Sequence, residues 1–218
     1  MLLLLVRHAV TDVTGQKLTG RLPGFSLSEK GRAQAESVSA RLSKAPLKAI
    51  YSSPLERCME TAEIIARHHR VKIETVDALE EVDYGQWQGK PLKALYRTKA
   101  WTKLRARPAD FRFPGGETIR EAQTRGMRAV EALRAKHKDR AVLVCSHADM
   151  IRLVVAGYLG LGIDLYDRIS IAPASVSILN VGDGTPRLLN LGDLGSFDDL
   201  FGALKSRGAS PSSRKTGR

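Results

Sequence analysis

The sequence predicts an α/β fold, a three-layer α/β/α sandwich with a mostly parallel central sheet. Short apolar runs of the kind that form buried strands alternate with longer segments whose apolar residues recur at helical spacing. Such alternation places successive strands parallel, with helices on both faces of the sheet. The chain has 218 residues, 43% of them hydrophobic, which is enough to bury one sizeable core.

The first half of the chain sets the pattern. The run "LLLLV" at 2–6 predicts the first strand. Ser28 is a typical N-cap residue, so a helix follows it. The apolar positions of that helix are Ala33, Ala35, Val38 and Leu42. Residues 47–53 form a second strand, Pro54 suits the first turn of a second helix, and residues 71–76 form a third strand.

The middle of the chain begins with a loop over 77–91, followed by a basic segment and the turn "FPGGET" at 113–118. A long amphipathic helix is predicted over roughly 117–137. The run "AVLVCS" at 141–146 is another buried strand, and a helix through "MIRLVVAGYLG" at 150–160 follows it.

The last third predicts a hairpin and a tail. Two strands, 175–181 and 186–191, are joined across Gly182-Asp183-Gly184. From about residue 204 the composition turns to Ser, Gly, Lys, Arg and Pro, which is typical of disorder. The sequence therefore predicts one domain over 1–203 and a disordered basic C-terminal tail over 204–218.

The chain is strongly basic, with a formal net charge of +12. The tail contributes five cations and no acid: Lys205, Arg207, Arg214, Lys215 and Arg218. Further cations at 97–107 interleave with Tyr96 and Trp101. Such patches suit nucleic acid, an anionic ligand or water. We favour a solvated face, and we do not expect nucleic acid as a partner.

No apolar run approaches the ~20 residues that span a bilayer, so we expect no membrane segment and a cytoplasmic location. Cys58 and Cys145 are too few for a disulfide framework or a structural zinc site. Both are expected to be reduced and buried. We also expect no metal and no cofactor.

Charged side chains follow several predicted strands. Arg7 and His8 leave strand 2–6, Arg57 lies one turn after strand 47–53, and His147 follows strand 141–146. Ligands of α/β sheets bind at the carboxyl ends of the strands, where helix N-termini also point their N–H groups. Two arginines and two histidines at this edge predict a pocket for phosphate.

Chemistry in such a pocket needs a nucleophile and a proton donor. A neutral imidazole can attack phosphorus, and arginines offset the charge on the equatorial oxygens in the transition state. A leaving alcohol departs readily only when protonated, so a carboxylic acid is required. The loop "LEEVDYGQWQG" at 79–89 offers Glu80, Glu81 and Asp83.

Five motifs, in this order, resemble the histidine phosphatase superfamily, the phosphoglycerate-mutase-like proteins. They are "LVRHAVT", "YSSPLERCMETA", "LEEVDYGQWQG", "FPGGET" and "VCSHADMIR". The resemblance spans residues 2 to about 190, and it implies a phosphoglycerate-mutase-like sandwich.

The resemblance also implies a role for each site residue. His8 is the phosphorylated nucleophile, Glu81 rather than Glu80 is the proton donor, and the phosphate pocket consists of Arg7, Arg57 and His147. Thr11 and Thr14 line the pocket or its entrance, Glu117 is the acid of the "GGE" turn, and Ala148 offers its backbone N–H. The substrate-binding set is thus Thr11, Thr14, Glu117 and Ala148.

The chain departs from the family pattern at the rim. Ala9 and Val10 follow the histidine where glycine and a polar residue are usual, Thr14 replaces asparagine, and Ala148-Asp149 replaces Gly-Gly. All charged members of the pocket remain. The expected activity is therefore a metal-independent phosphatase acting on a small phosphomonoester, whose identity the rim residues leave open.

Two alternatives stay open. A cofactor-dependent phosphoglycerate mutase uses the same histidine, but mutases carry a longer insertion with paired arginines than this chain has between Gly89 and Gly115. A phosphate-binding protein without catalysis is the other alternative, and the intact charged set disfavours it. Residues 90–116 and the loop after Arg21 are expected to form a lid whose cations favour substrates with additional anionic groups.

Overall fold

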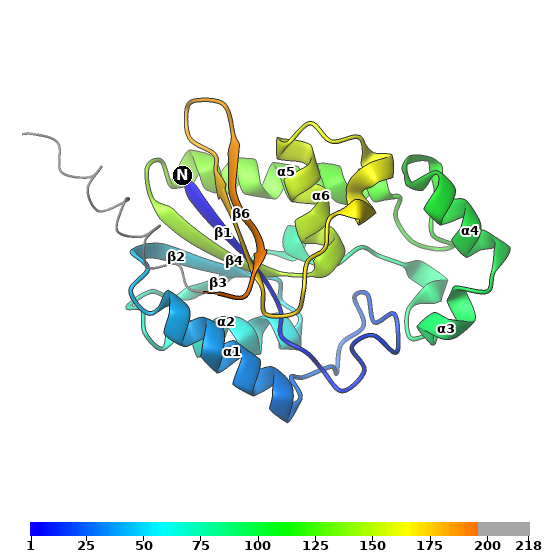
Figure 1. The fold of residues 1–218 in the computed structure, drawn as a ribbon, viewed down its shortest axis with the longest axis horizontal. Helices are drawn as coiled ribbons and strands as arrows, with labels where there is room; N and C mark the ends of the chain where they lie inside the picture. Colours follow the sequence, from blue (N-terminus) through cyan, green and yellow to red (C-terminus); the bar gives the residue numbers. More distant parts are fainter. Residues whose placement is uncertain (196–218) are drawn as a thin grey trace, which may run out of the picture.

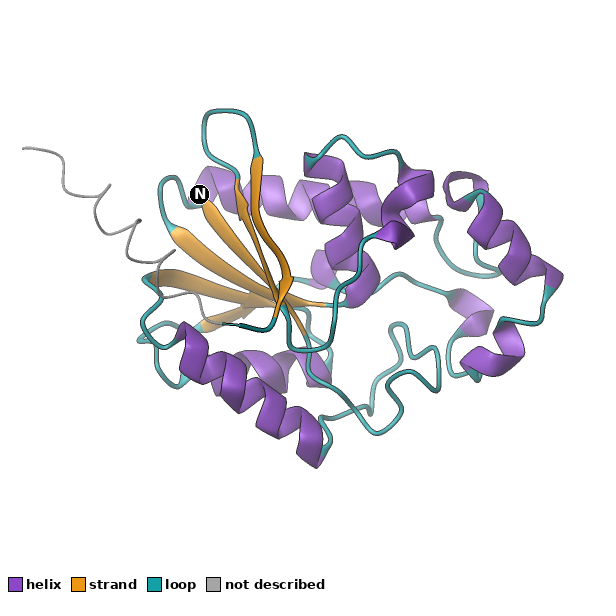
Figure 2. Ribbon diagram, in the orientation of Figure 1, coloured by secondary structure: helices purple, strands orange, loops and turns teal. Residues whose placement is uncertain are grey.

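The computed structural model describes residues 1–195 and confirms the predicted fold, a six-stranded sheet with helices on both faces (Figures 1 and 2). The strands are β1 (Leu2–Arg7), β2 (Leu47–Ser52), β3 (Ile73–Thr75), β4 (Ala141–Ser146), β5 (Val176–Asn180) and β6 (Arg187–Asp193). The predicted tail, and residues 196–203 of the predicted domain, lie outside the described residues.

The strand order in the sheet is β3-β2-β4-β1-β5-β6. The first four of these strands are mutually parallel. β5 is antiparallel to β1, and β6 is antiparallel to β5, which confirms the predicted hairpin. Because the short link between β5 and β6 cannot cross over the sheet, the two strands must run in opposite directions.

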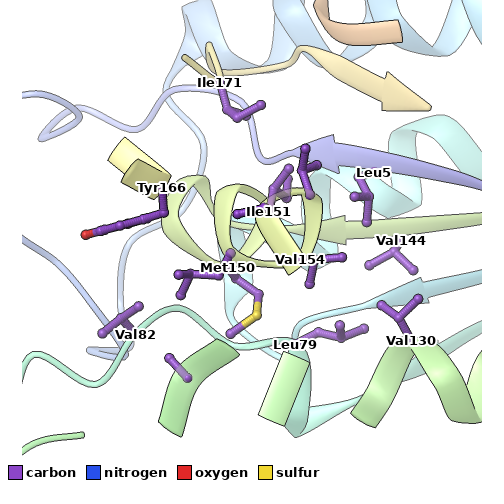
Figure 3. Close-up of a cluster of buried hydrophobic side chains, with 14 of the residues drawn as sticks. Leu5, Leu79, Val82, Val130, Val144, Met150, Ile151, Val154, Tyr166 and Ile171 are labelled. Carbon is purple, nitrogen blue, oxygen red and sulfur yellow. The ribbon is translucent and has the colours of Figure 1, made fainter. Parts of the chain in front are cut away.

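Helices of ten or more residues cover both faces of the sheet. They are α1 (Glu29–Leu42), α2 (Glu56–Ala66), α5 (Ile119–Lys136) and α6 (Ala148–Tyr158). Side chains alternate along β1, so that Leu2 and Leu4 pack in the core under α1 and α2. Leu3 and Leu5 pack in the other core, under α5 and α6, part of which Figure 3 shows.

One helix start and one strand differ from the prediction. α2 begins at Glu56 rather than Pro54, because the backbone of Leu55 is extended and Leu55 is the N-cap. α6 begins at Ala148, directly after His147, as expected. The strand predicted over 71–76 shortens to β3 because it pairs only with the last three residues of β2.

The basic segment folds into two small helices, α3 (Leu92–Leu95) and α4 (Lys99–Ala106), followed by a 3₁₀ turn at Pro108–Asp110. We call residues 92–110 the cap. Figure 1 shows it at the far end of the molecule from the N-terminus. Leu95 and Leu104 anchor the cap in the core.

Within residues 1–195 no helix is both long and apolar enough to cross a membrane. The same residues contain no group of three histidine, cysteine or acidic side chains arranged to bind a metal ion. Cys58 and Cys145 are both buried and unlinked.

Candidate active site

Parallel pairing of β1 with β4 brings the two predicted histidines together. Arg7 lies opposite Ser146 at the ends of these strands, so the next residues, His8 and His147, are also neighbours. Their rings meet edge to face with centroids 5.2 Å apart. The backbone N–H of His8 donates to the carbonyl of Ser146 (2.9 Å), which fixes this end of β1.

One hydrogen bond shows which ring nitrogen of His8 carries the proton, and the pKa shows that the ring is neutral. Its Nδ1 lies 2.8 Å from the carbonyl oxygen of Ala9, and a carbonyl oxygen only accepts. Nδ1 therefore bears the proton and the lone pair is on Nε2. Burial, together with the nearby charges of Arg57 and Arg7, lowers the pKa of His8 to about 3. The imidazole is neutral and nucleophilic at physiological pH.

Arg57, at the start of α2, is almost completely buried, with 1% of its surface exposed. One of its terminal nitrogens, Nη2, donates to the carbonyl of Gly20 (2.6 Å). Its Nε and Nη1 are buried with no hydrogen-bond partner among the described residues, and so is the Nε of Arg7. Buried cationic donors without partners are costly, and an anion at this point would satisfy them.

The ring of His147 is fully buried among the side chains of Arg57, Ser53 and Cys58. Its Nδ1 lies 3.3 Å from Nη2 of Arg57, and its Nε2 lies 2.8 Å from the hydroxyl of Ser53. A guanidinium only donates, so Nδ1 accepts and the proton is on Nε2. Burial, Arg57 and His8 hold the pKa of His147 well below its usual value, so this imidazole is also neutral.

Glu81 lies against the N-terminus of α6. One carboxyl oxygen accepts from the N–H groups of Val82 (3.1 Å) and Met150 (3.2 Å), and the other accepts from the N–H of Asp149 (3.4 Å). Burial, and then the negative charge of Asp149, raise the pKa of Glu81 to about 7. A carboxyl with this pKa retains its proton in a substantial fraction of molecules at neutral pH.

The neighbouring Glu80 has different surroundings. Its carboxylate lies 3.5 Å from Nε of Arg21 in an ion pair that is partly exposed. The two adjacent acids therefore differ in kind: Glu81 is buried at a helix N-terminus, and Glu80 is paired with a cation. This geometry suits Glu81 for proton donation.

Three of the predicted substrate-binding residues, Thr11, Thr14 and Ala148, lie close to His8 or His147 in the chain. Ala148 is the first residue of α6, so its N–H is among those that a helix cannot satisfy internally. Thr11 and Thr14 bond to each other: their hydroxyls are 3.0 Å apart, and the N–H of Thr11 donates to Thr14 Oγ1 (2.8 Å). They close a turn just beyond His8.

Glu117 is placed among cations rather than beside His8. Its Oε1 accepts from Arg21 (2.9 Å), Arg125 (2.7 Å) and the N–H of Asp83 (2.9 Å). Both arginines also donate to the backbone carbonyl of Glu81, at 3.0 and 3.2 Å. The contacts of Glu117 therefore fix the loop that carries the candidate acid.

Sequence reasoning missed Ser53, Arg21 and Arg125. Ser53 is a polar residue at the end of a predicted strand, which is a signal of the kind that identified His147. The two arginines offered no local signal, because Arg21 lies 60 residues and Arg125 lies 44 residues from Glu81 in the sequence.

Comparisons with known proteins agree with this geometry. The sequence profile of the histidine phosphatase superfamily (branch 1) matches residues 3–194. Phosphoserine phosphatase 1 of Hydrogenobacter thermophilus is 29% identical over 197 residues, covering 87% of this chain and 90% of that protein. The 2,3-bisphosphoglycerate-dependent phosphoglycerate mutase of Thermoplasma acidophilum is 28% identical over 202 residues, covering 90% and 94%.

Among solved structures, Bacillus stearothermophilus YhfR superposes with a TM-score of 0.83 at 27% identity, covering 89% of this chain and 98% of that chain. The likeness therefore extends over most of the fold.

Proposed function

This chain belongs to the histidine phosphatase superfamily, and on that basis we propose that it hydrolyses a small phosphomonoester through a phosphohistidine formed on His8. The proposal rests on one observation: a buried neutral imidazole, His8, lies in the same site as buried guanidinium N–H groups that lack hydrogen-bond partners. A phosphate dianion satisfies those donors and presents its phosphorus to Nε2.

In the first step, the lone pair of His8 Nε2 attacks phosphorus while the bond from phosphorus to the ester oxygen breaks. Arg7, Arg57 and the N–H of Ala148 bind the equatorial oxygens and offset their charge, which is the work a metal ion does elsewhere. Glu81 gives its proton to the departing oxygen, so an alcohol leaves rather than an alkoxide.

In the second step, water replaces the alcohol beside the phosphohistidine. The Glu81 carboxylate takes a proton from the water as its oxygen attacks phosphorus, and the bond from phosphorus to Nε2 breaks. Inorganic phosphate leaves, while His8 returns to the neutral form and Glu81 to the acid. No cofactor is consumed in this cycle.

We assign catalysis to residues 1–203 and a cytoplasmic location to the protein, where the two buried thiols stay reduced. The partner in this scheme is a small-molecule phosphomonoester, and nucleic acid has no role in it.

Rapid acid-free quenching during turnover of 4-nitrophenyl phosphate tests the intermediate. A phosphoenzyme that is stable in alkali and labile in acid is expected, and His8→Ala should abolish it together with turnover while leaving the circular dichroism spectrum unchanged. EDTA should not slow the reaction. A phosphoenzyme that is labile in alkali, or activity that metal restores after EDTA, contradicts the proposal.

The similarity to a phosphoglycerate mutase favours transfer as the second candidate function. Both reactions share the phosphohistidine and differ in whether water or a bound hydroxy acid accepts the phosphoryl group. Incubation with 3-phosphoglycerate and a trace of 2,3-bisphosphoglycerate separates them. Release of inorganic phosphate supports the phosphatase, whereas rapid formation of 2-phosphoglycerate with little free phosphate supports the mutase.

A further inference from the structure

A cavity of about 220 Å³ lies between the cap and the start of α6. It adjoins the candidate acid, because Asp149, which lines the cavity, donates its backbone N–H to Glu81. An alcohol that takes its proton from Glu81 lies next to this carboxyl and is therefore within reach of the cavity. The volume is below the ~300–1,000 Å³ of pockets for drug-sized ligands, so it suits an alcohol about the size of one ring.

Aromatic side chains form much of the cavity wall. They are Tyr84, Tyr96, Trp101, Phe113 and Tyr166. Tyr96 is 52% exposed although it is large and apolar, and its ring lies 4.7 Å from that of Trp101. Figure 3 shows Tyr166 at the margin of the core, with its hydroxyl pointing away from the apolar cluster. Faces of this kind favour a flat ring in the ligand.

The charged groups of the cavity are already paired with each other. Asp149 accepts from Arg152 (2.7 Å) and from the Tyr84 hydroxyl (2.7 Å). Arg105 forms an ion pair with Asp167. The Nε of Arg152 is also buried without a partner among the described residues. Because Asp149 already balances the charge of Arg152, this N–H can bind a neutral acceptor atom of the ligand.

The remaining cap cations do not alter this balance. The cations Lys93, Arg97, Lys99 and Lys103 are exposed and are not part of the cavity wall, and Arg107 pairs with Asp110 at the surface. In the phosphate pocket, Arg7 and Arg57 match the two charges of the phosphate. A second anion held in the cavity therefore meets, among the cations of the wall, only arginines that already face a carboxylate, contrary to what the basic sequence of the cap suggested.

We propose that this cavity binds the alcohol part of the substrate, and that this alcohol is uncharged and carries an aromatic or heteroaromatic ring. The proposal rests on the phosphatase function above and deepens it. It disfavours phosphate esters of hydroxy acids and of amino acids, whose carboxylates lack a partner in the cavity.

Matched substrates test the two parts of the proposal. 4-Carbamoylbenzyl phosphate and 4-carboxybenzyl phosphate have nearly the same shape and differ in charge, and benzyl and ethyl phosphate differ in the ring. We expect kcat/KM to be at least about 10-fold higher for the carboxamide than for the carboxylate, and for benzyl than for ethyl. Equal values in either pair overturn the corresponding part.

Variants tie these preferences to the cavity. Asp167→Asn releases Arg105 and should shrink the preference for the carboxamide several-fold. The matched control, Asp110→Asn, releases Arg107 outside the cavity and should leave that preference unchanged. Tyr96→Ala, at an exposed position that the fold tolerates, should shrink the preference for benzyl over ethyl. Equal effects of Asp167→Asn and Asp110→Asn contradict the assignment.

Calorimetric binding of the corresponding phosphonates, which cannot be hydrolysed, separates this proposal from the phosphatase function. If the neutral aromatic phosphonate binds more tightly but no ester is hydrolysed, the phosphatase function fails and the cavity assignment holds. If esters are hydrolysed but the phosphonates bind without preference, the cavity assignment fails.

Discussion

His8 and Glu81 acquire opposite proton preferences from the same cause, burial. Desolvation disfavours the charged form of any group, so it keeps the imidazole neutral, with a single proton on Nδ1, and favours the protonated form of the carboxyl. Two adjacent arginines reinforce the effect on His8. In this way one buried site holds, at neutral pH, an uncharged imidazole and a carboxyl that retains its proton in a substantial fraction of molecules.

Glu81→Gln should affect substrates according to their leaving group. Alkyl phosphates need the proton, so their kcat should fall on the order of 10²–10⁴-fold, whereas 4-nitrophenyl phosphate should lose far less. Steady-state kinetics gives the ratio of kcat for alkyl phosphates to kcat for 4-nitrophenyl phosphate. Glu80→Gln is the control and should leave this ratio unchanged. If Glu80→Gln lowers the ratio and Glu81→Gln does not, Glu80 is the proton donor.

The dependence of kcat/KM on pH should follow the fraction of Glu81 that is protonated. Because its pKa is raised to about 7, kcat/KM for benzyl phosphate should fall as pH rises above about 7. His8, with a pKa of about 3, is neutral throughout this range. 4-Nitrophenyl phosphate has the same kind of phosphate ionisation but no need of the acid, so it serves as the reference.

Asp149→Asn extends that test. The carboxylate of Asp149 helps to raise the pKa of Glu81, so its removal should shift the fall in activity to lower pH. If the pH profile of the unmodified protein is retained in both Asp149→Asn and Glu81→Gln, a group other than Glu81 causes the fall in activity.

At the scale of elements, the site depends on how strand ends and helix starts meet. β1 and β4 place the two histidines, α2 begins three residues after Ser53 and brings in Arg57, and the first turn of α6 supplies N–H groups to Glu81. Glu81 itself lies between two short 3₁₀ helices, Asp77–Leu79 and Gly85–Trp87, and belongs to neither, so other contacts must hold its loop. Arg21 and Arg125 fix it by its backbone carbonyls, and Glu117 fixes both arginines.

Glu117→Gln distinguishes positioning from substrate binding. If Glu117 acts through the arginines, kcat for alkyl phosphates should fall on the order of 10-fold with little change in KM, and aryl phosphates should be spared. A rise in KM for every substrate at constant kcat indicates direct substrate binding, as the resemblance implies. Glu121→Gln is the control, since its carboxylate pairs with Arg112 and glutamine also serves in its capping box.

For the whole molecule, the excess positive charge is spread over the surface and the terminal segment. Five cations belong to residues 204–218, and several of those in the cap are exposed or paired. Steering of anionic substrates by such a field weakens with salt. The charge therefore bears on encounter with substrate more than on the chemistry at His8.

Removal of residues 204–218 should leave kcat and KM for small phosphomonoesters within about twofold at physiological salt, because the proposed site is complete without them. Steady-state kinetics of the shortened chain provides the measurement. A collapse of activity shows that the segment closes over the site. Loss of a salt-sensitive affinity for RNA, seen with the full chain, assigns the segment an electrostatic role.

The sequence by itself determined the strands, the helices and the charged residues that leave them. Local apolar runs such as 2–6 and 141–146 predict buried parallel strands. At the ends of these strands lie Arg7, His8, Arg57 and His147. The acid had to be chosen from Glu80, Glu81 and Asp83 by resemblance, since adjacent carboxylates look alike in a sequence.

Only the tertiary structure decided the environments of those residues. Desolvation of Glu81 and the pairing of Arg105 with Asp167 depend on contacts between segments far apart in the chain. The proton on Nδ1 of His8 depends on the local geometry that brings the ring to the carbonyl of the next residue, Ala9. The basic cap is the clearest case. Its composition predicted a preference for additional anions, but its cavity-lining arginine, Arg105, pairs with Asp167, which lies 62 residues further along the chain. Because this ion pair joins two segments that only the tertiary fold brings together, no local pattern in the sequence predicts it.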